Sequence, residues 1–388
     1  MKLTIKAGDL LSALEQTSMT IGKKADLPYS WMYLEARGDK ENQRVLTFAT
    51  DMVGRTLIKT GATVTKPGSV FIKHDLLAGF ISSIPKDEDV ELWITGTENQ
   101  KLNFKCSAGK GSLYLKNTGD DTAKTIDTLP FKAKPTFEIA ATTLLYLIGK
   151  TEFATTNDRQ PILSTVHFYG SKEGYTAEAT DGNIVARAFC KDANATEGVE
   201  ITIPSSGLVP LTKMLSSHKD EIVKVIPGNE QGASEPSHSM YFRFSDTMYG
   251  TILMADKFPN IDRVFEGADK VKGSNFRIPT DQLRQALNRA NLFAEGGHIK
   301  FDISENTLKV SSEGASRGKF DATIDGSDPE QKVTTNVSLA LAYIIRALKD
   351  AKSNVITLQT SVDGSRVWLF DNEDLEKNAI YLLGCIQQ

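Results

Sequence analysis

The sequence has little cysteine and no long apolar run. Its three cysteines, Cys106, Cys190 and Cys385, form no Cys-x-x-Cys pair, so we expect neither a zinc ribbon nor a disulfide scaffold, and this usage is typical of a reducing compartment. No run approaches the roughly 18 apolar residues of a membrane-spanning helix. Asp9 and Glu15 interrupt the apolar core that a signal peptide would need. We therefore expect a cytoplasmic protein.

The sequence also lacks an excess of basic charge. Lys and Arg number 45 against 49 Asp and Glu, which gives a net charge of -4. This balance excludes a uniformly basic nucleic-acid-binding protein, but it allows a basic patch that acidic surface elsewhere offsets. The length of 388 residues, 40% of them apolar, predicts two to four domains at roughly 100–200 residues each.

An internal repeat gives the number of domains. Segments 3–14, 137–148 and 276–287 each have apolar residues two apart, a short polar step and then apolar residues at helical spacing. Their starts lie 134 and 139 residues apart (137 − 3 and 276 − 137), close to one third of the chain. Repeats of this kind indicate equivalent structural units. We predict three domains, at 1–130, 131–260 and 261–388.

A weaker half-repeat lies inside each domain, so each is expected to contain two copies of a strand followed by a helix. Asp9, Asp75, Ser206, Asp281 and Ser338 are placed near first helical turns, where short polar residues are favoured. The six helices are predicted at 9–18, 75–83, 142–150, 206–216, 281–291 and 338–349.

Between the helices the chain alternates apolar and polar residues in short runs, such as 45–50 and 240–244. Closely spaced strands of this kind favour antiparallel pairing. The fold class is therefore α+β, with three repeated domains that each pack two helices on antiparallel sheets. Joints are expected at 128–134 and 258–273, which are rich in Pro, Gly or Lys.

The predicted helices carry a charge bias that the whole chain lacks. Of their four acids, Asp9, Asp75 and Asp281 lie at N-termini, and only Glu15 lies mid-helix. The helical bases are Lys150, Lys213, Arg284, Arg289, Arg346 and Lys349. Two interpretations stay open: a shared basic face, or bases that merely favour helix C-termini because of the macrodipole.

Several motifs carry a resemblance to a known family. Segment 151–163 contains Phe-Ala and then Arg-Gln-Pro-Ile-Leu, and 178–182 reads Glu-Ala-Thr-Asp-Gly. Segment 256–264, Asp-Lys-Phe-Pro-Asn-Ile-Asp-Arg-Val, and the weaker 336–338, Asn-Val-Ser, match further family positions. In order and spacing the chain resembles the bacterial sliding clamp, the beta subunit of DNA polymerase III, as a divergent member.

The resemblance implies a DNA polymerase processivity factor. Two chains of three DNA-clamp-type domains would form a head-to-tail dimeric ring around duplex DNA, with the helices facing the hole. The implied partners are double-stranded DNA held topologically and without sequence preference, a DNA polymerase, the clamp loader and other clamp-motif proteins. A repeat-built interaction scaffold that does not encircle DNA is the alternative. No cofactor and no membrane contact are expected.

The resemblance also implies DNA-binding residues. Lys23 and Lys24 match a family loop that touches DNA, although adjacent lysines on a polar loop are also typical of plain solvation. Ser205 and Ser206 stand where many clamps have bases, so contact in the second domain is expected to fall on Lys150 and Lys213. The complete expected set is Lys23, Lys24, Lys73, Lys150, Arg159, Gln160, Lys213, Arg284, Arg289 and Arg346.

Family members bind partners in an apolar pocket between the second and third domains, through short peptides of the Gln-Leu-x-Leu-Phe type. Asn183 and Ile184 replace the family's His-Arg. The family ends in Met-Pro-x-Arg-Leu or a similar sequence, whereas 381–388 reads Tyr-Leu-Leu-Gly-Cys-Ile-Gln-Gln here, so partner preference is expected to differ. Each apolar member could instead be an ordinary core residue. By position the pocket would be Leu163, Thr180, Gly182, Ile184, Val185, Pro259, Arg263, Val264, Leu382 and Leu383.

The dimer interface implied by the resemblance joins an edge strand of the first domain to a helix end of the third. The matching residues are Leu113 and Leu115 with Leu292 and Phe293. The preceding helix already has a complete apolar stripe, so Leu292 and Phe293 are additional apolar residues at its end. The alternative is a local core beneath the Gly296-Gly297 turn.

An enzyme is the competing class. The one Gly-x-Ser-x-Gly match, at 314–318, lies between strand-like runs, so it predicts a hairpin turn and not a nucleophile elbow. The five histidines lack metal-ligand spacing, so no metal site is expected. Asp51 and Asp181 each follow Ala-Thr at repeat-equivalent positions. They could form paired carboxylates, but capping the same turn in two domains is the simpler interpretation.

Overall fold

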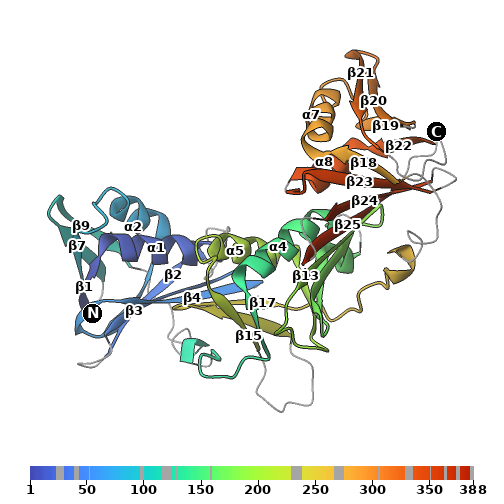
Figure 1. The fold of residues 1–388 in the computed structure, drawn as a ribbon. Helices are drawn as coiled ribbons and strands as arrows, with labels where there is room; N and C mark the ends of the chain where they lie inside the picture. Colours follow the sequence, from blue (N-terminus) through green and yellow to red (C-terminus); the bar gives the residue numbers. More distant parts are fainter. Residues whose placement is uncertain are drawn as a thin grey trace. The chain divides into compact units, whose positions relative to one another are not determined.

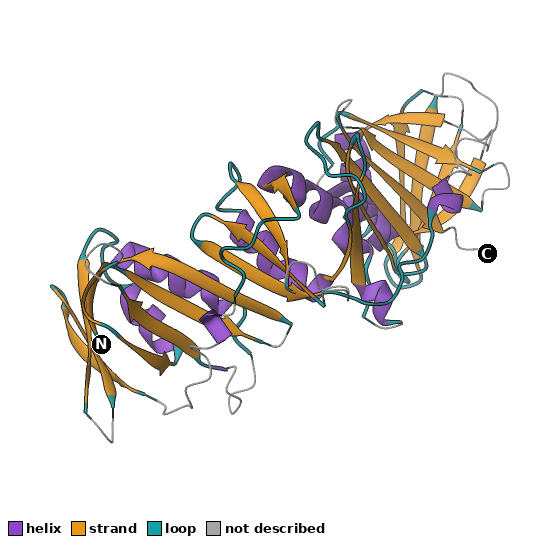
Figure 2. Ribbon diagram, turned by 90° about the horizontal axis from the view of Figure 1, so that it is seen from below, coloured by secondary structure: helices purple, strands orange, loops and turns teal. Residues whose placement is uncertain are grey.

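The computed structural model of the chain contains helices and antiparallel sheets (Figures 1 and 2). It describes residues 1–22, 30–38, 43–51, 53–96, 100–115, 125–127, 129–157, 160–228, 238–265, 275–304, 306–327, 335–349, 351–361, 365–372 and 376–384. The chain divides into two compact units. Unit 1 comprises Met1–Ala141 and Ser206–Leu253, and unit 2 comprises Thr142–Ser205 and Met254–Gln388.

Unit 1 contains two antiparallel sheets. The five-stranded sheet has the order β5-β1-β7-β8-β9, formed by Thr63–Lys66, Lys2–Lys6, Asp89–Thr95, Lys101–Cys106 and Gly109–Tyr114. The eight-stranded sheet has the order β10-β15-β16-β17-β4-β3-β2-β6, formed by Phe137–Ala140, Ile222–Pro227, Ser239–Phe244, Thr247–Ile252, Gly54–Gly61, Arg44–Thr50, Met32–Arg37 and Gly68–Ile72.

Unit 2 repeats this pattern. Its eight-stranded sheet has the order β14-β11-β12-β13-β25-β24-β23-β18, formed by Glu200–Pro204, Thr165–Gly170, Gly174–Thr180, Ile184–Lys191, Lys377–Gly384, Arg366–Asn372, Val355–Thr360 and Asn275–Pro279. Its four-stranded sheet has the order β21-β20-β19-β22, formed by Gly318–Asp325, Thr307–Gly314, His298–Ile303 and Thr335–Ala340.

Six helices each follow directly on a strand, as the repeat predicts. They are α1 after β1, α2 after β6, α4 after β10, α5 after β14, α7 after β18 and α8 after β22. Their bounds are Ala7–Ser18, His74–Ile81, Ala141–Thr151, Ser205–Leu215, Thr280–Ala290 and Leu341–Lys349. The α+β class with helices on antiparallel sheets is confirmed.

The start of the last helix was predicted wrongly. Ser338 lies within β22 and not at a helix start. Along this strand the buried Thr335, Val337 and Leu339 alternate with side chains that are exposed or half-buried. The helix begins only at Leu341, and its buried residues Leu341, Ile344, Ala347 and Leu348 follow the 3.6-residue period.

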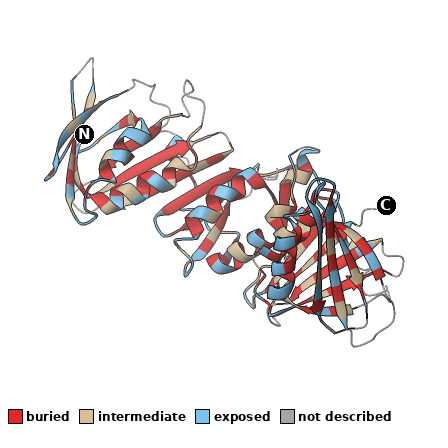
Figure 3. Cartoon of the chain, turned by 90° about the horizontal axis from the view of Figure 1, so that it is seen from above, coloured by how far each residue is buried: buried red, intermediate tan, exposed pale blue. Residues whose placement is uncertain are grey.

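Burial explains why these elements hold together (Figure 3). In unit 1, α1 packs on β3 and β4 and against α2, where Leu10, Leu14, Leu77 and Ile81 are fully buried. A fully buried leucine or isoleucine stabilises the fold by about 1.5–3 kcal/mol. In unit 2, α7 and α8 pack together, and α7 also covers β20 and β21.

Each eight-stranded sheet is assembled from two four-stranded halves. In unit 1 the halves join where β17 pairs with β4, and in unit 2 where β13 pairs with β25. The remaining halves, β1-β7-β8-β9 and β22-β19-β20-β21, end in β9 and β21. In the part of the chain that the structure describes, β9 and β21 each have a paired strand on one side only.

The segments predicted as joints pack on the sheets. In unit 1, Leu129 of the predicted joint and the preceding Ile126 are buried against Tyr33, Leu57 and Met248. In unit 2, Phe258, Ile261 and Phe265 are buried against Val185 and Trp368. Within the described residues, no helix is long and apolar enough to cross a membrane, and Cys106 and Cys190 are buried thiols outside any disulfide.

Candidate functional site

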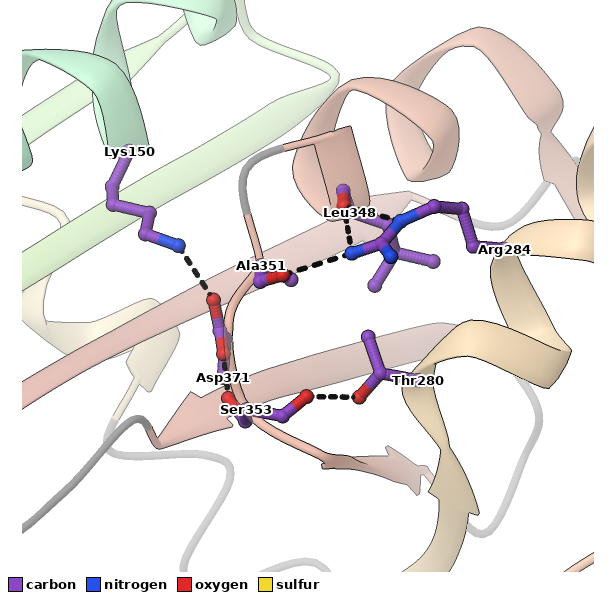
Figure 4. Close-up of polar contacts among 7 residues, drawn as sticks. All are labelled: Lys150, Thr280, Arg284, Leu348, Ala351, Ser353 and Asp371. Carbon is purple, nitrogen blue, oxygen red and sulfur yellow. Dashed lines mark hydrogen bonds and ion pairs between the residues drawn. The ribbon is translucent and has the colours of Figure 1, made fainter.

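Lys150 does not lie on the surface, which contradicts its predicted contact with DNA. It is only 4% exposed and pairs with Asp371, which is fully buried, at 2.7 Å between Nζ and Oδ2 (Figure 4). The Ser353 hydroxyl also donates to Asp371, and the Thr280 hydroxyl donates to the Ser353 carbonyl at 2.5 Å. Lys150 therefore joins α4 to β24 inside unit 2.

Arg284 is also engaged within the protein. Its guanidinium donates to the carbonyl oxygens of Leu348, at 3.2 and 3.3 Å, and Ala351, at 2.8 Å (Figure 4), and it pairs with Asp281 at 2.6 Å. These carbonyls lie at the C-terminal end of α8, where backbone acceptors lack helical partners. The arrangement makes Arg284 a cap for α8, so little of its charge is available to a phosphate.

The other predicted DNA-binding residues divide by exposure. Lys73, Gln160, Lys213, Arg289 and Arg346 are exposed, whereas Lys23, Lys24 and Arg159 lie outside the described residues. The Arg346 guanidinium also donates to the Phe153 carbonyl at 3.4 Å.

The exposed helical charges differ between the units. On α1 and α2 they are the acids Asp9, Glu15 and Asp75. On α7 and α8 the exposed bases Arg289, Arg346 and Lys349 outnumber the exposed Asp281. The expected basic bias is thus concentrated on the helices of unit 2, with Lys213 of α5 as the helical base in unit 1.

Three of the predicted pocket residues meet on one face of the eight-stranded sheet of unit 2, beside Trp368. Thr180 pairs with Val185, Val185 with Leu382, and Leu382 with Trp368. Directly opposite residues in antiparallel strands point to the same face, so these side chains form a row. Leu163, Val185, Val264 and Leu382 belong to a single apolar cluster that includes the fully buried Trp368.

Ile184 and Leu383 contradict the predicted pocket. They pair with each other, one residue along from Val185 and Leu382, and successive strand side chains point to opposite faces. Both are buried on the other side of the sheet. Gly182, Pro259 and Arg263 are exposed, which suits the rim of a binding surface.

A turn beside the apolar cluster is fixed by Asp181. Its Oδ1 accepts the backbone N–H groups of Asn183 and Ile184 at 2.7 and 2.9 Å, and the Tyr343 hydroxyl donates to Oδ2 at 2.5 Å. Gly182 adopts a φ of +88° there, a backbone conformation that glycine takes without strain.

The corresponding turn of unit 1 is built in the same way. Asp51 Oδ1 accepts the N–H groups of Val53 and Gly54 at 3.0 and 2.7 Å. The prediction that the two aspartates cap equivalent turns is confirmed.

A charged network that the sequence did not reveal lies next to the apolar cluster. Arg187 donates to Glu178 Oε1 and to Asp262 Oδ1, both at 2.5 Å, and its guanidinium carbon lies 4.4 Å from the centre of the Phe265 ring. The Tyr169 hydroxyl donates to the same Glu178 oxygen at 3.1 Å. In the sequence, Glu178 and Arg187 are visible only as charged residues within strand-like runs, and nothing there indicates that they pair with each other.

Burial changes the acid–base properties of this region. It raises the pKa of the Glu178 carboxyl, an effect that Arg187 opposes, and burial together with the Glu178 charge raises the pKa of Tyr169 to about 12. Nearby, burial lowers the pKa of His167. The His167 ring stacks on Phe258, with centres 5.0 Å apart and planes 7° apart.

The residues predicted for the dimer interface lie near the two unpaired strand edges. Leu113 and Leu115 are half-buried and pack on the core of unit 1. Leu292 is 68% exposed, and Phe293 stacks on Phe320 of β21 with ring centres 5.7 Å apart. Tyr114, which the prediction omitted, is 75% exposed at the end of β9.

The Gly-x-Ser-x-Gly match is a hairpin turn, as predicted, since Gly314 of β20 pairs with Gly318 of β21. The Ser316 hydroxyl donates to Glu295 at 3.0 Å. Among the described residues, no group of three or more His, Cys, Asp or Glu side chains could hold a metal ion.

The chain was compared with protein-family models, with curated proteins and with solved structures. No family model matches the chain. It is 22% identical to the beta sliding clamp of Staphylococcus aureus over 371 residues, 92% of each chain. It is 23% identical to the beta sliding clamp of Synechococcus elongatus over 381 residues, 95% of each.

A solved structure of a putative DNA polymerase III beta subunit from Eubacterium rectale superposes with a TM-score of 0.84 at 17% identity, and covers 100% of both chains. The similarity in sequence and the similarity in structure thus each extend over nearly the whole length. The chain has the DNA polymerase III beta subunit fold and is a divergent relative of the beta sliding clamps.

Proposed function

We propose that the chain is a sliding clamp: a DNA polymerase processivity factor that encircles duplex DNA as a homodimeric ring. The observation that carries the proposal is the sequence similarity to beta sliding clamps over 92–95% of the chain, supported by the shared fold. Three domains at 1–130, 131–260 and 261–388 remain part of this proposal. A clamp loader, a polymerase and other clamp-motif proteins are the proposed partners.

Loading onto nicked circular DNA tests the ring. The protein is loaded with a bacterial clamp loader and isolated with the circle, and the circle is then cut once. A topological clamp stays on the circle and slides off the linear product. Equal retention on both forms would refute encirclement and favour a scaffold that binds DNA or protein without enclosing it.

The strand edges support a head-to-tail dimer. Four of the six half-sheets are already joined in pairs through β4–β17 and β13–β25. The two remaining half-sheets end in β9 and β21. If β9 of one copy paired with β21 of another, these two half-sheets would join into an eight-stranded arrangement like the other two. An edge strand offers a row of unpaired backbone groups for such pairing. The apolar side chains beside these edges, Tyr114 and Leu292 among them, would be covered.

Disruption of the proposed interface tests the dimer. The double variant Leu292→Asp, Phe293→Asp should sediment as a monomer, because it places charges at a surface that must lose water. Leu76→Asp is the matched control, since Leu76 is an exposed leucine, at 58%, on α2 and belongs to neither edge strand. A double variant that remains dimeric at micromolar concentration would rule out this interface.

The DNA contacts are proposed to be few and sequence-independent. Arg289, Arg346, Lys349 and Lys213 are exposed helical bases, and Lys73 lies at the start of α2. Phosphate contacts supply affinity without reading bases, which suits a protein that slides. Lys23, Lys24, Arg159 and Gln160 stay in the proposal as loop contacts.

The partner site is proposed at the apolar cluster of unit 2. Leu163, Val264 and Leu382 are half-buried members of that cluster, and Pro259 and Arg263 are exposed beside it. Half-buried apolar side chains with an exposed polar rim suit a short peptide with leucine and phenylalanine anchors. Titration with a labelled Gln-Leu-Ser-Leu-Phe peptide tests the site, and Leu382→Asp should abolish binding.

A further inference from the structure

The segment 254–265 carries part of the proposed partner site. It presents Pro259, Arg263 and Val264, yet it forms no strand of the sheet beneath it. The Met254 N–H donates to the Thr202 carbonyl at 2.9 Å at its start. Beyond that point the contacts that hold the segment on the sheet come from its side chains.

Ile261 of the segment is buried in the apolar cluster, and two further side-chain contacts hold the segment. The first is Phe258, which is buried and stacked on His167. The second is Arg187 of β13, which pairs with Asp262 at 2.5 Å and lies over the ring of the buried Phe265 at 4.4 Å. Arg263 and Val264 stand between the two residues that Arg187 contacts, so the position of Arg187 contributes to where they project.

Arg187 is itself held in place by a buried carboxylate of the sheet, that of Glu178 on β12. Its Nε donates to Glu178, whose side chain is only 6% exposed and also accepts the Tyr169 hydroxyl. The Arg187 side chain is 20% exposed and Asp262 is 60% exposed. A planar guanidinium that is fixed on one side by a buried carboxylate presents its remaining N–H groups in a defined direction. The network therefore transmits the position of β12 and β13 to the segment.

We propose that Arg187, fixed by Glu178, is a positioning residue for the partner-peptide site. It holds Pro259, Arg263 and Val264 where a peptide with apolar anchors docks beside Leu382. This inference rests on the partner site proposed above. The guanidinium acts through the segment and does not itself contact the peptide.

Unit 1 contains a matched network that serves as a control. Arg37 pairs with Glu35 through Nε and with Asp127 through Nη1, both at 2.7 Å. Asp127 lies beside Ile126, which is buried on the eight-stranded sheet of that unit. Arg37 thus holds the other connecting segment with the same chemistry, in a unit that lacks the proposed partner site.

The experiment measures affinity for the Gln-Leu-Ser-Leu-Phe peptide in the full-length protein. The test variant is Arg187→Met with Glu178→Gln, which removes both charges and leaves no buried carboxylate without a partner. We expect its affinity to fall about tenfold, because a site whose wall is no longer fixed must be ordered on binding.

Three further variants make the test specific. Asp262→Asn removes only the exposed partner of Arg187 and should weaken binding less, by about threefold. Arg187→Lys keeps one ion pair but not the guanidinium fork, and should restore part of the affinity. The control, Arg37→Met with Glu35→Gln, should bind the peptide as the unmodified protein does.

The outcomes separate the two proposals. If the unmodified protein binds the peptide and the Arg187 variants bind equally well, the positioning role is wrong and the partner site stands. If the Arg37 control loses as much affinity as the Arg187 variant, the effect is general destabilisation and the positioning role is again wrong. If the unmodified protein does not bind the peptide, the proposed partner site fails, and the inference fails with it.

Discussion

The buried pair of Lys150 and Asp371 should behave as a coupled unit. Their side chains are 4% and 0% exposed, and Nζ lies 2.7 Å from Oδ2. Lys150→Met leaves the Asp371 carboxylate in the interior with the Ser353 hydroxyl as a remaining donor. Removing one member of a buried ion pair costs about 3–5 kcal/mol. We expect that decrease in the free energy of unfolding of unit 2.

The double variant Lys150→Met, Asp371→Leu should be destabilised far less. It removes both charges, and well-packed apolar replacements of buried ion pairs are commonly neutral in stability. The Ser353 hydroxyl then has no carboxylate acceptor, which costs about 1–3 kcal/mol. The coupling free energy between the two sites should therefore reach about 2 kcal/mol or more.

The measurement uses the tryptophan of unit 2. Trp368 is fully buried on β24, three residues before Asp371, and the chain has three tryptophans in all. In a Trp31→Phe, Trp93→Phe background, Trp368 fluorescence in a urea titration reports the unfolding of unit 2. Single-variant destabilisations that add to within about 0.5 kcal/mol would refute the coupling. Because Lys150 is buried, Lys150→Met should also leave the salt dependence of DNA binding unchanged.

Three further outcomes are expected. Burial lowers the pKa of His167, so as the pH drops from above 6.5 the unfolded chain binds this proton before the folded chain does, and stability falls until the pH has passed the folded-state pKa. The variant His167→Gln should flatten that part of a plot of melting temperature against pH. An unchanged plot would assign the effect to other groups. Arg289→Ala and Lys349→Ala should each make the affinity for linear duplex DNA less dependent on salt. The slope of log affinity against log salt should become less steep by about one unit for each phosphate that the variant no longer neutralises. Slopes equal to that of the unmodified protein would exclude these bases from the DNA-binding surface. Asp181→Ala should cost about 1 kcal/mol more in urea unfolding than Asp51→Ala, since among the described residues Asp181 also accepts a hydroxyl, that of Tyr343, and Asp51 does not. Equal costs would contradict this account.

Local pattern predicted much of the fold. The three repeats placed all six helices after strands, because the change from a two-residue to a 3.6-residue apolar period is encoded within a dozen residues. Ser338 misled the prediction, since a polar residue before an apolar run is typical both of a helix start and of the exposed face of a strand. In the structure Ser338 pairs with Lys300 of β19, so it belongs to a strand and not to a helix start.

Residues whose role depends on distant partners could not be assigned from the sequence. Lys150 is a lysine at the end of a helix, and nothing near it indicates that Asp371, 221 residues away, accepts its charge. Arg187 and Asp262 likewise meet only in the folded chain. Ile184 is different, because its neighbour Val185 was assigned to the same site, and two successive residues of a strand cannot face the same side.

The continuity of the eight-stranded sheets has a consequence for how the chain can be divided. In unit 1 the ladder of backbone hydrogen bonds runs without a break from β4 into β17, although these strands belong to different sequence repeats. A fragment cut at residue 130 would keep β4 without its neighbour, so it would expose an unprotected strand edge prone to self-association. The sequence repeats and the compact structural units are therefore different divisions of this chain.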